Sequence, residues 1–495
     1  MLMTFRSLLL ILAVVLVPPW SSVARAGDGP DVLALAQAMF PTADRVGEFS
    51  GMPPAARVQQ NNQTIGYVFF TDDVLPIPAY SGKPVNCLVG FDRHGRIQGV
   101  HIVHHEEPIL VVGLSDTDLA RFTSQYRDLP IEQDIRIGGH PKPGRSIIDG
   151  ISGATITSMV INRTINLGVK KVAAKRDLLK KSSDGILSFE QPEPLWKQLW
   201  QARVPHIAIL ATGLFTLFCI LLFQDWIASH PVLLQRLRTA YLLFTVIFIG
   251  WIAAGQLSIV NVLTFTNSLL QGFKWESFLM DPVLFLLWSF VALTMLLWGR
   301  GVYCGWLCPF GALQELLFRL ARRLKLPEWE PPDILHERLW ALKYLILLAL
   351  FGLSLQSLAR AERFAEVEPF KTAFSLHFWR DWPFVLYALL ILALGLVVRK
   401  AFCRYLCPLG ASLTFPSRFR IFDWLRRRKE CGHPCQTCAR ECEIRAIRPT
   451  GDIIENECHY CLDCQVTYWN YNKCPPLVEK RKKRERAIRL SQPDS

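Results

Sequence analysis

Cysteine is scarce in the first 300 residues of this 495-residue chain, where only Cys87 and Cys219 occur. So few thiols exclude a disulfide framework in that half. No pair of histidines within the apolar segments offers axial ligands for a haem, since His206 stands alone at the edge of one segment. No helix-turn-helix or other DNA-reading pattern accompanies the formal net charge of +13, which argues against nucleic-acid binding. Charged residues make up only 20% of the chain and hydrophobic residues 51%, which indicates a membrane protein.

The amino terminus is typical of a secretory signal peptide over residues 1–26. Arg6 precedes an apolar run from Leu8 to Val17, and a group of small residues ends at Ala26. An uncleaved membrane anchor is the alternative, although the apolar run is short for a span.

The residues that follow, 27–201, are mixed in character. Short strands are expected at 67–70, 87–91 and 96–100, with turns at glycines between them. Helical spacing of apolar residues predicts a helix over 154–178. We therefore expect an α+β domain in this region.

Five apolar segments come next, each about long enough to cross a membrane. They cover residues 204–223, 240–259, 282–298, 339–355 and 382–398. Six basic residues lie between Arg300 and Arg338, whereas only Lys274 lies between the second and third segments. The positive-inside rule thus places the 27–201 domain in the periplasm and everything after Lys400 in the cytoplasm. Buried helices of a large globular protein are the alternative, but such helices seldom stay so free of charge.

One sequence pattern occurs twice, at Arg300–Ala312 and at Arg399–Ala411, and each copy contains Cys-x3-Cys-Pro. The thiols belong to Cys304 and Cys308 in the first copy and to Cys403 and Cys407 in the second. If the helix persists, thiols four residues apart face one partner, which suits a metal, a cluster or a reversible disulfide. Structural cysteines at a helix end are the alternative, and the sequence does not decide what the four thiols bind.

The remaining eight cysteines fall in two runs between Cys431 and Cys474. Closely spaced thiolates suit three irons of one cubane, and in two-cluster ferredoxins the fourth ligand comes from the other run. This logic predicts two [4Fe-4S] clusters, the first on Cys431, Cys435, Cys438 and Cys474 and the second on Cys442, Cys458, Cys461 and Cys464. Zinc sites are the alternative, but they usually present separated Cys-x2-Cys pairs. Glu443 stands where proline usually follows the fourth cysteine.

A stretch of small residues opens the helix expected after residue 154. Asp149, Ser152, Gly153 and Ala154 would let a phosphate approach backbone N–H groups at the helix start, where the helix dipole favours an anion. An ordinary Ser/Thr N-cap is the alternative. The stretch resembles the D-x-x-S-G-A-T signature of the FMN-binding domains in the RnfG and NqrC subunits of ion-pumping reductases. That resemblance implies covalent FMN on Thr155, with Thr157 as the second candidate.

In the order of its parts, the chain resembles the NosR/NirI family, membrane flavo-iron–sulfur proteins of denitrification. Matching runs lie at 255–262, 368–373 and 456–468. The resemblance implies an electron-transfer component, not a stand-alone enzyme, that supports the expression and activity, or the maturation, of periplasmic nitrous-oxide reductase. The periplasmic region between Thr155 and the first apolar segment is shorter than usual for such proteins.

Together these features predict a multidomain protein of the bacterial inner membrane with an α+β periplasmic FMN-binding domain, five transmembrane helices and a two-cluster ferredoxin-like domain. Its parts are a signal peptide (1–26), the flavin domain (27–201), a membrane region with the first Cys-x3-Cys-Pro (202–400), the second copy with a basic linker (401–430), the ferredoxin-like domain (431–478) and a basic tail (479–495). A quinol or a cytoplasmic protein is the expected electron donor. A redox-sensing regulator, or a maturation factor whose repeated thiols handle copper, are the alternatives.

Overall fold

The computed structural model describes residues 31–77, 84–105, 116–138, 144–151, 154–176, 195–271, 273, 275–433 and 435–491. The expected signal peptide lies outside these residues. The chain divides into two compact units. The first comprises Met1–Ala202, Thr266–Asp281 and Leu358–Arg363, and the second Arg203–Phe265, Pro282–Ser357 and Phe364–Ser495.

The first unit is built on a five-stranded antiparallel sheet with strand order β1-β2-β3-β4-β5. Its strands are β1 (Arg45–Val46), β2 (Ala56–Gln60), β3 (Gln63–Phe70), β4 (Asn86–Asp92) and β5 (Ile97–His104). The expected strands at 67–70 and 87–91 fall within β3 and β4, and the one at 96–100 matches the start of β5. The strands predicted from the sequence in this part of the domain are therefore confirmed.

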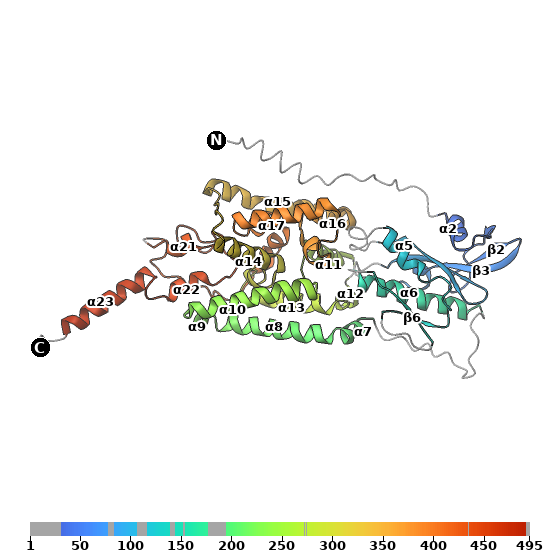
Figure 1. The fold of residues 1–495 in the computed structure, drawn as a ribbon, viewed down its shortest axis with the longest axis horizontal. Coiled ribbons are helices and arrows are strands. Elements are labelled where there is room, and N and C mark those ends of the chain that lie inside the picture. The colour runs from blue at the N-terminus through green and yellow to red at the C-terminus, as the bar shows by residue number, and fades with distance from the viewer. Residues whose placement is uncertain are drawn as a thin grey trace. The chain divides into compact units, whose positions relative to one another are not determined.

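Helices cover both faces of this sheet because side chains alternate along each strand. Val68 and Leu88 pack with the end of α2 (Val32–Met39) on one face. Phe69 and Val89 face the other way and pack against α6 (Thr155–Ala174), which runs alongside the strands (Figure 1). The apolar stripe of α6 consists of the residues whose spacing predicted the helix, and all of them are buried: Ile161, Ile165, Val169 and Val172.

A second, smaller sheet supports the start of α6. It pairs β6 (Asp134–Ile137) in parallel with β7 (Arg145–Ile148), and β7 leads into the loop before the helix. The remaining helices of this unit are α3 (Thr71–Val74), α5 (Asp116–Ser124), α7 (Leu195–Ala202), α12 (Trp275–Leu279) and most of α16 (Leu358–Phe364). Trp200 on α7 donates a hydrogen bond to the carbonyl of Leu279 at 2.8 Å, which ties these two helices together.

The second unit contains an apolar helix at each of the five expected places. They are α8 (Val204–Leu222), α10 (Pro231–Phe244) continuing into the π-helix η1 (Thr245–Ile252), α13 (Pro282–Leu297), α15 (Asp333–Gln356) and α17 (Trp382–Val397). Among the described residues, only α8, α10 with η1, and α15 are long and apolar enough to cross a membrane. α11 (Ile259–Gln271), α13 and α17 are shorter apolar helices, and α8 and α13 lie side by side (Figure 1).

The second apolar helix differs from the expected segment 240–259. It begins at Pro231, ends at Ile252 and is separated from α11 by a short non-helical stretch. Arg238 does not end the helix because its charge is paired with Glu315 in the protein interior. Gly255 lies in the break, where a Cβ would come within 2.8 Å of the Leu287 side chain, so the close packing there requires glycine.

Shorter elements form the remainder of the second unit. They are α9 (Gln224–Ala228), η2 (Tyr303–Leu307), α14 (Pro309–Arg323), η3 (Ala365–Val367), η4 (Lys371–Ser375), α18 (Ala401–Tyr405), α19 (Pro408–Ser412), α20 (Thr414–Ser417), α21 (Thr437–Glu441), α22 (Asp463–Trp469) and α23 (Pro475–Ser491). One hydrophobic core joins the apolar helices to both copies of the repeat and to the loop around Tyr460. The cysteine-rich region is thus packed directly onto the helical bundle.

Candidate functional site

The loop from β7 to α6 is held by a side-chain amide. Gln125 donates to the carbonyl of Asp149 at 3.1 Å and accepts from its N–H at 2.7 Å. Gly150 follows, and a Cβ there would lie 2.9 Å from Ile137 on β6. The chain therefore leaves β7 in one fixed direction before it enters the helix.

The first turn of α6 has the features of an anion site. Ala154 is the N-cap and provides no side-chain hydrogen bond to the helix. Ser158 instead accepts from the N–H of Ile151 at 3.0 Å and donates to the carbonyl of Ala154 at 2.9 Å. An N-cap without a side-chain acceptor leaves backbone donors at the helix start available to a phosphate. Thr155 is the first residue of the helix. Thr157 lies in the first turn, and only 2% of its surface is exposed.

Two further residues fix α6 against the small sheet. Asn162 donates to the carbonyl of Ile135 at 2.7 Å and accepts from the Tyr126 hydroxyl at 3.0 Å. Sequence reasoning missed both, although a polar residue beside the apolar stripe of a helix was a signal for such a contact. Of the predicted flavin residues, Ser152 and Gly153 lie outside the described part of the chain.

Seven of the eight carboxyl-terminal cysteines line two small cavities. One is lined by four of the cysteines assigned to a single cluster, Cys442, Cys458, Cys461 and Cys464, with Cys438 at its edge. The other is lined by Cys431, Cys435 and Cys438. Cys474 is buried beside the start of α23 and does not line either cavity.

Backbone and amide donors point at several of these sulfurs. The N–H groups of Arg428, Ala446 and Tyr460 lie 3.3–3.4 Å from the Sγ atoms of neighbouring cysteines. Such contacts stabilise thiolates and tune the potential of iron–sulfur clusters. Burial raises the pKa of Cys458 to about 11 and that of Cys464 to about 12, so these thiols lose their protons only when a cation replaces them.

The geometry distinguishes a cluster from a single ion. Within the described ranges, no three His, Cys, Asp or Glu side chains are arranged to hold one metal ion. In a cubane each thiolate binds a different iron, so the sulfurs need not converge on one point. Cysteine thiols with N–H groups pointing at them are the donor set expected of an iron–sulfur cluster.

The two Cys-x3-Cys-Pro copies share one local structure. Cys308 and Cys407 are the N-caps of α14 and α19, with φ/ψ of −76°/112° and −72°/105°. Each Sγ accepts from the N–H three residues later, at 3.5 Å from Gly311 and 3.2 Å from Gly410. A helix does not persist through both cysteines, because the backbone becomes extended at the second cysteine, as is usual before proline.

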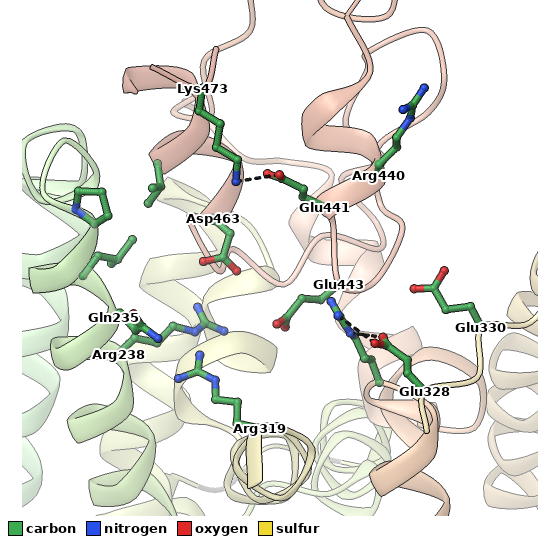
Figure 2. Close-up of a pocket in the computed structure, with 14 residues that line it drawn as sticks. Gln235, Arg238, Arg319, Glu328, Glu330, Arg440, Glu441, Glu443, Asp463 and Lys473 are labelled. Carbon is green, nitrogen blue, oxygen red and sulfur yellow. Dashed lines mark hydrogen bonds and ion pairs between the residues drawn. The ribbon is translucent and has the colours of Figure 1, made fainter. Parts of the chain in front are cut away.

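A polar cavity of about 930 Å³ lies where α10 and α14 meet the cysteine-rich region. Figure 2 shows basic and acidic side chains facing one another across it, with Lys473 paired to Glu441. Glu443 stands where proline usually follows the fourth cysteine of a ferredoxin run. It lines this polar cavity and neither of the two cavities lined by cysteines. Basic and acidic side chains line the cavity in equal number. The basic ones are Arg238, Arg319, Arg399, Arg440 and Lys473, and the acidic ones are Glu328, Glu330, Glu441, Glu443 and Asp463. The cavity therefore has no strong preference for an ionic ligand of either sign.

Buried ion pairs surround the cysteines. Arg238 forms two hydrogen bonds of 2.8 Å with Glu315, which also pairs with Lys400 at 2.8 Å. Next to Cys458, Glu457 pairs with Lys343 and Arg300. Sequence reasoning missed these residues because their partners lie on distant segments.

Comparison with known proteins supports this arrangement of parts. Regulatory protein NosR from Pseudomonas aeruginosa is 36% identical, over 92% of this chain and 93% of that protein. The chain belongs to the NosR/NirI family. The alignment spans 667 positions, more than the length of this chain, so this NosR/NirI member lacks segments that the relative has.

Other NosR/NirI proteins are more similar over a shorter region. Regulatory protein NosR from Stutzerimonas stutzeri is 58% identical over 60% of this chain and 41% of its own length. Protein NirI from Paracoccus denitrificans is 50% identical over 59% of this chain and 43% of its own length. These alignments cover less than half of either relative.

Family models match each candidate region. The FMN-binding domain matches residues 80–170, which include the start of α6. The NosR model matches 429–485, the segment with eight cysteines, and the 4Fe-4S binding domain matches 280–327 and 381–430. The chain is thus a NosR-like regulatory or electron-transfer protein of the membrane, with FMN-binding and 4Fe-4S binding domains. For the repeated Cys-x3-Cys-Pro segments, sequence reasoning left a metal, a cluster and a reversible disulfide open, and this match favours the cluster.

Proposed function

We propose that this protein carries electrons across the bacterial inner membrane to support the activity, expression or maturation of periplasmic nitrous-oxide reductase. The observation that carries the proposal is the grouping of Cys442, Cys458, Cys461 and Cys464 around one cavity, in a chain that also has an FMN-binding domain. FMN and iron–sulfur clusters both accept and release single electrons, so one chain with both is suited to electron transfer. A quinol or a cytoplasmic protein is the donor that this arrangement favours.

FMN is attached to Thr155. The residue begins α6, where an N-cap without a side-chain hydrogen bond leaves helix N–H groups for the phosphate. Asp149 and Ala154 lie just before this residue, and Ser152 and Gly153 complete the predicted motif in the sequence. Thr157 is nearly fully buried, which makes it a poor acceptor for a bulky flavin phosphate.

Two [4Fe-4S] clusters occupy the carboxyl-terminal region. Cys442, Cys458, Cys461 and Cys464 hold one, and Cys431, Cys435, Cys438 and Cys474 hold the other. The cavity lining supports the first set fully and three members of the second.

The two cofactor regions lie on opposite sides of the membrane. The first compact unit combines the flavin domain with Thr266–Asp281 and Leu358–Arg363, the connections expected in the periplasm. In the second unit, Arg445 from the cysteine-rich region pairs with Glu330 and Asp333 from the basic loop expected in the cytoplasm. Each cofactor domain thus associates with the connections that are expected on its own side of the membrane.

A redox-sensing regulator is the second candidate, and the name of two relatives, regulatory protein NosR, favours it. In that reading the clusters report the redox state and no electrons need reach a reductase. Electron flow from reduced clusters to FMN in the purified chain would separate the carrier from the sensor.

The flavin assignment is tested by anaerobic purification followed by a denaturing gel viewed for flavin fluorescence. Wild type and a Thr157→Ala control should fluoresce, and Thr155→Ala should not, because only its hydroxyl forms the phosphoester. The iron content of all three should be equal. Fluorescence that survives denaturation in Thr155→Ala would contradict the attachment site.

A further inference from the structure

The repeated Cys-x3-Cys-Pro segments are capped in equivalent ways. In the first copy, the N–H of Phe310 donates to Gln256 Oε1 at 3.1 Å. In the second, the N–H of the corresponding Leu409 donates to Glu368 Oε1 at 3.1 Å. Neither acceptor belongs to the repeat, so two unrelated segments hold the two helices in the same way. The second cysteine of each copy, Cys308 or Cys407, is therefore held in the same position relative to the helix that follows it.

The two copies are packed against each other. Phe310 of the first copy contacts Phe402 of the second with ring centroids 5.2 Å apart. Arg300 donates to the carbonyl of Gly410 at 2.5 Å, and the Sγ of Cys403 lies 3.3 Å from Gln314 Oε1 on α14. Each copy therefore contributes groups that touch the cysteine region of the other.

The four thiols form one buried neighbourhood. Cys308 and Cys407 are each 7% exposed and belong to the same hydrophobic core, against which Cys304 packs. Cys403 approaches the same region, because its Sγ lies 3.3 Å from Gln314 Oε1 on α14, the helix that Cys308 caps. Cysteines of both copies thus lie in one region of the core.

The polar groups around these thiols suit bound sulfur. Gln256 lies 3.6 Å from the Cys308 sulfur through Nε2. Gln314 is fully buried, and Nε2 of its amide has no hydrogen-bond partner among the described residues. An unpartnered amide beside Cys403 is costly in a dry core unless a ligand accepts its hydrogen bond.

The first copy also touches the loop that carries the tail cysteines. A Cβ on Gly305 would lie 1.8 Å from the carbonyl oxygen of His459, so the two backbones are in direct contact. Trp306 donates its indole N–H to the carbonyl of Tyr460 at 3.0 Å. The segment between Cys304 and Cys308 therefore lies against the segment between Cys458 and Cys461.

We propose that Cys304, Cys308, Cys403 and Cys407 together hold one iron–sulfur cluster, built jointly by the two copies of the repeat. Each segment matched by the 4Fe-4S binding domain contains only two cysteines, half of the four thiolates that a cluster requires. Two copies that meet in one core provide all four.

This third centre is placed to exchange electrons with the tail cluster on Cys442, Cys458, Cys461 and Cys464. One electron leaves the reduced cluster and reduces the other, with no proton or further reactant required. This electron exchange rests on the proposed function, because it needs the tail cluster as a partner. The binding of a cluster by the four repeat cysteines does not depend on the proposed function.

The test compares iron, acid-labile sulfide and the reduced EPR spectrum of anaerobically purified full-length variants. Wild type should hold about two or about four irons beyond the roughly eight of the tail, for a binuclear or a cubane centre respectively. Cys304→Ala and Cys407→Ala should each lose that same increment, and the double variant should lose no more. Cys219→Ala, a cysteine outside every group, is the matched control and should lose none.

Three results would overturn the proposal: unchanged iron in both single variants, losses that add in the double variant, or copper or zinc in place of iron. A retained EPR signal of the tail clusters reports that the carboxyl-terminal region of each variant has folded. If an alanine variant fails to accumulate, Cys304→Ser replaces it, and an unchanged EPR spectrum would then also reject the site.

A tail variant separates this proposal from the proposed function. Cys461→Ala should remove tail iron and leave the signal of the repeat centre. If tail iron is absent in wild type but the repeat increment is present, the proposed function fails and the repeat site stands.

Discussion

The second cysteines of the two repeat copies cap their helices in the same way, but the two copies have different surroundings. Where the first copy has Gly301 and Gly305, the second has Lys400 and Arg404. The glycines bring the backbone of the first copy against the Cys458–Tyr460 loop, and Lys400 joins the second copy to the buried carboxylate Glu315. The cysteines are thus held constant while the residues between them decide what each copy touches. The first copy therefore contacts the loop that carries the tail cysteines, and the second copy neutralises the charge of the buried Glu315 carboxylate.

Removing the buried carboxylate should disturb the second copy most. Glu315→Gln leaves Arg238 and Lys400 buried with no anion, and breaking such a group typically costs about 3–5 kcal/mol. We expect thermal unfolding in detergent to begin at a clearly lower temperature. Glu337→Gln, at a position on α15 for which no ion pair is described, is the control. Equal stability of the two variants would show that the charge network does not hold the second copy.

The glycine contact of the first copy can be broken by one methyl group. Gly305→Ala places a Cβ on the His459 carbonyl, and relief of such overpacking costs about 1–3 kcal/mol. We expect lower thermal stability and a changed EPR signal from the neighbouring tail cluster. Gly352→Ala on α15 is the matched control, because a Cβ there meets nothing within 4 Å. If both substitutions were neutral, the first copy would not need its close contact with the tail.

The two capping acceptors differ in charge, and pH should reveal it. Burial raises the pKa of Glu368 to about 7 from an ordinary value near 4.5, whereas its counterpart Gln256 does not titrate. The folded state therefore holds a proton that the unfolded state has lost, so stability should fall as pH rises from about 4.5 and level off above 7. We expect a change of about 3 kcal/mol. Glu368→Gln should flatten this part of the stability profile, and a slope equal to that of wild type would contradict the assignment.

Local patterns were sufficient for some parts of this protein. The spacing of Ile161, Ile165 and Val169 predicted α6, because helical periodicity follows directly from burial of one face. The strand at 87–91 was found by the same kind of local signal. The repeat itself was visible because its residues are contiguous in sequence.

Other features depend on residues that are distant in sequence. The second membrane segment was placed at 240–259, after Arg238, whereas the helix already begins at Pro231; the partner of Arg238, Glu315, is identifiable only in the fold. The shared roles of Gln256 and Glu368 could not be predicted either, since neither lies in the repeat. The meeting of the two Cys-x3-Cys-Pro copies likewise requires tertiary contacts such as that of Phe310 with Phe402.

The close approach of Gly305 to His459 also has a consequence for biosynthesis. Both copies of the repeat leave the ribosome before the loop that covers the first copy, and about 50 residues separate Ala411 from that loop. At roughly 5–20 residues per second, this interval lasts a few seconds. During that time all four repeat thiols are already made, while the surface around Gly305 still lacks its cover. The order of synthesis thus gives assembly factors access to these thiols before the end of the chain closes over them.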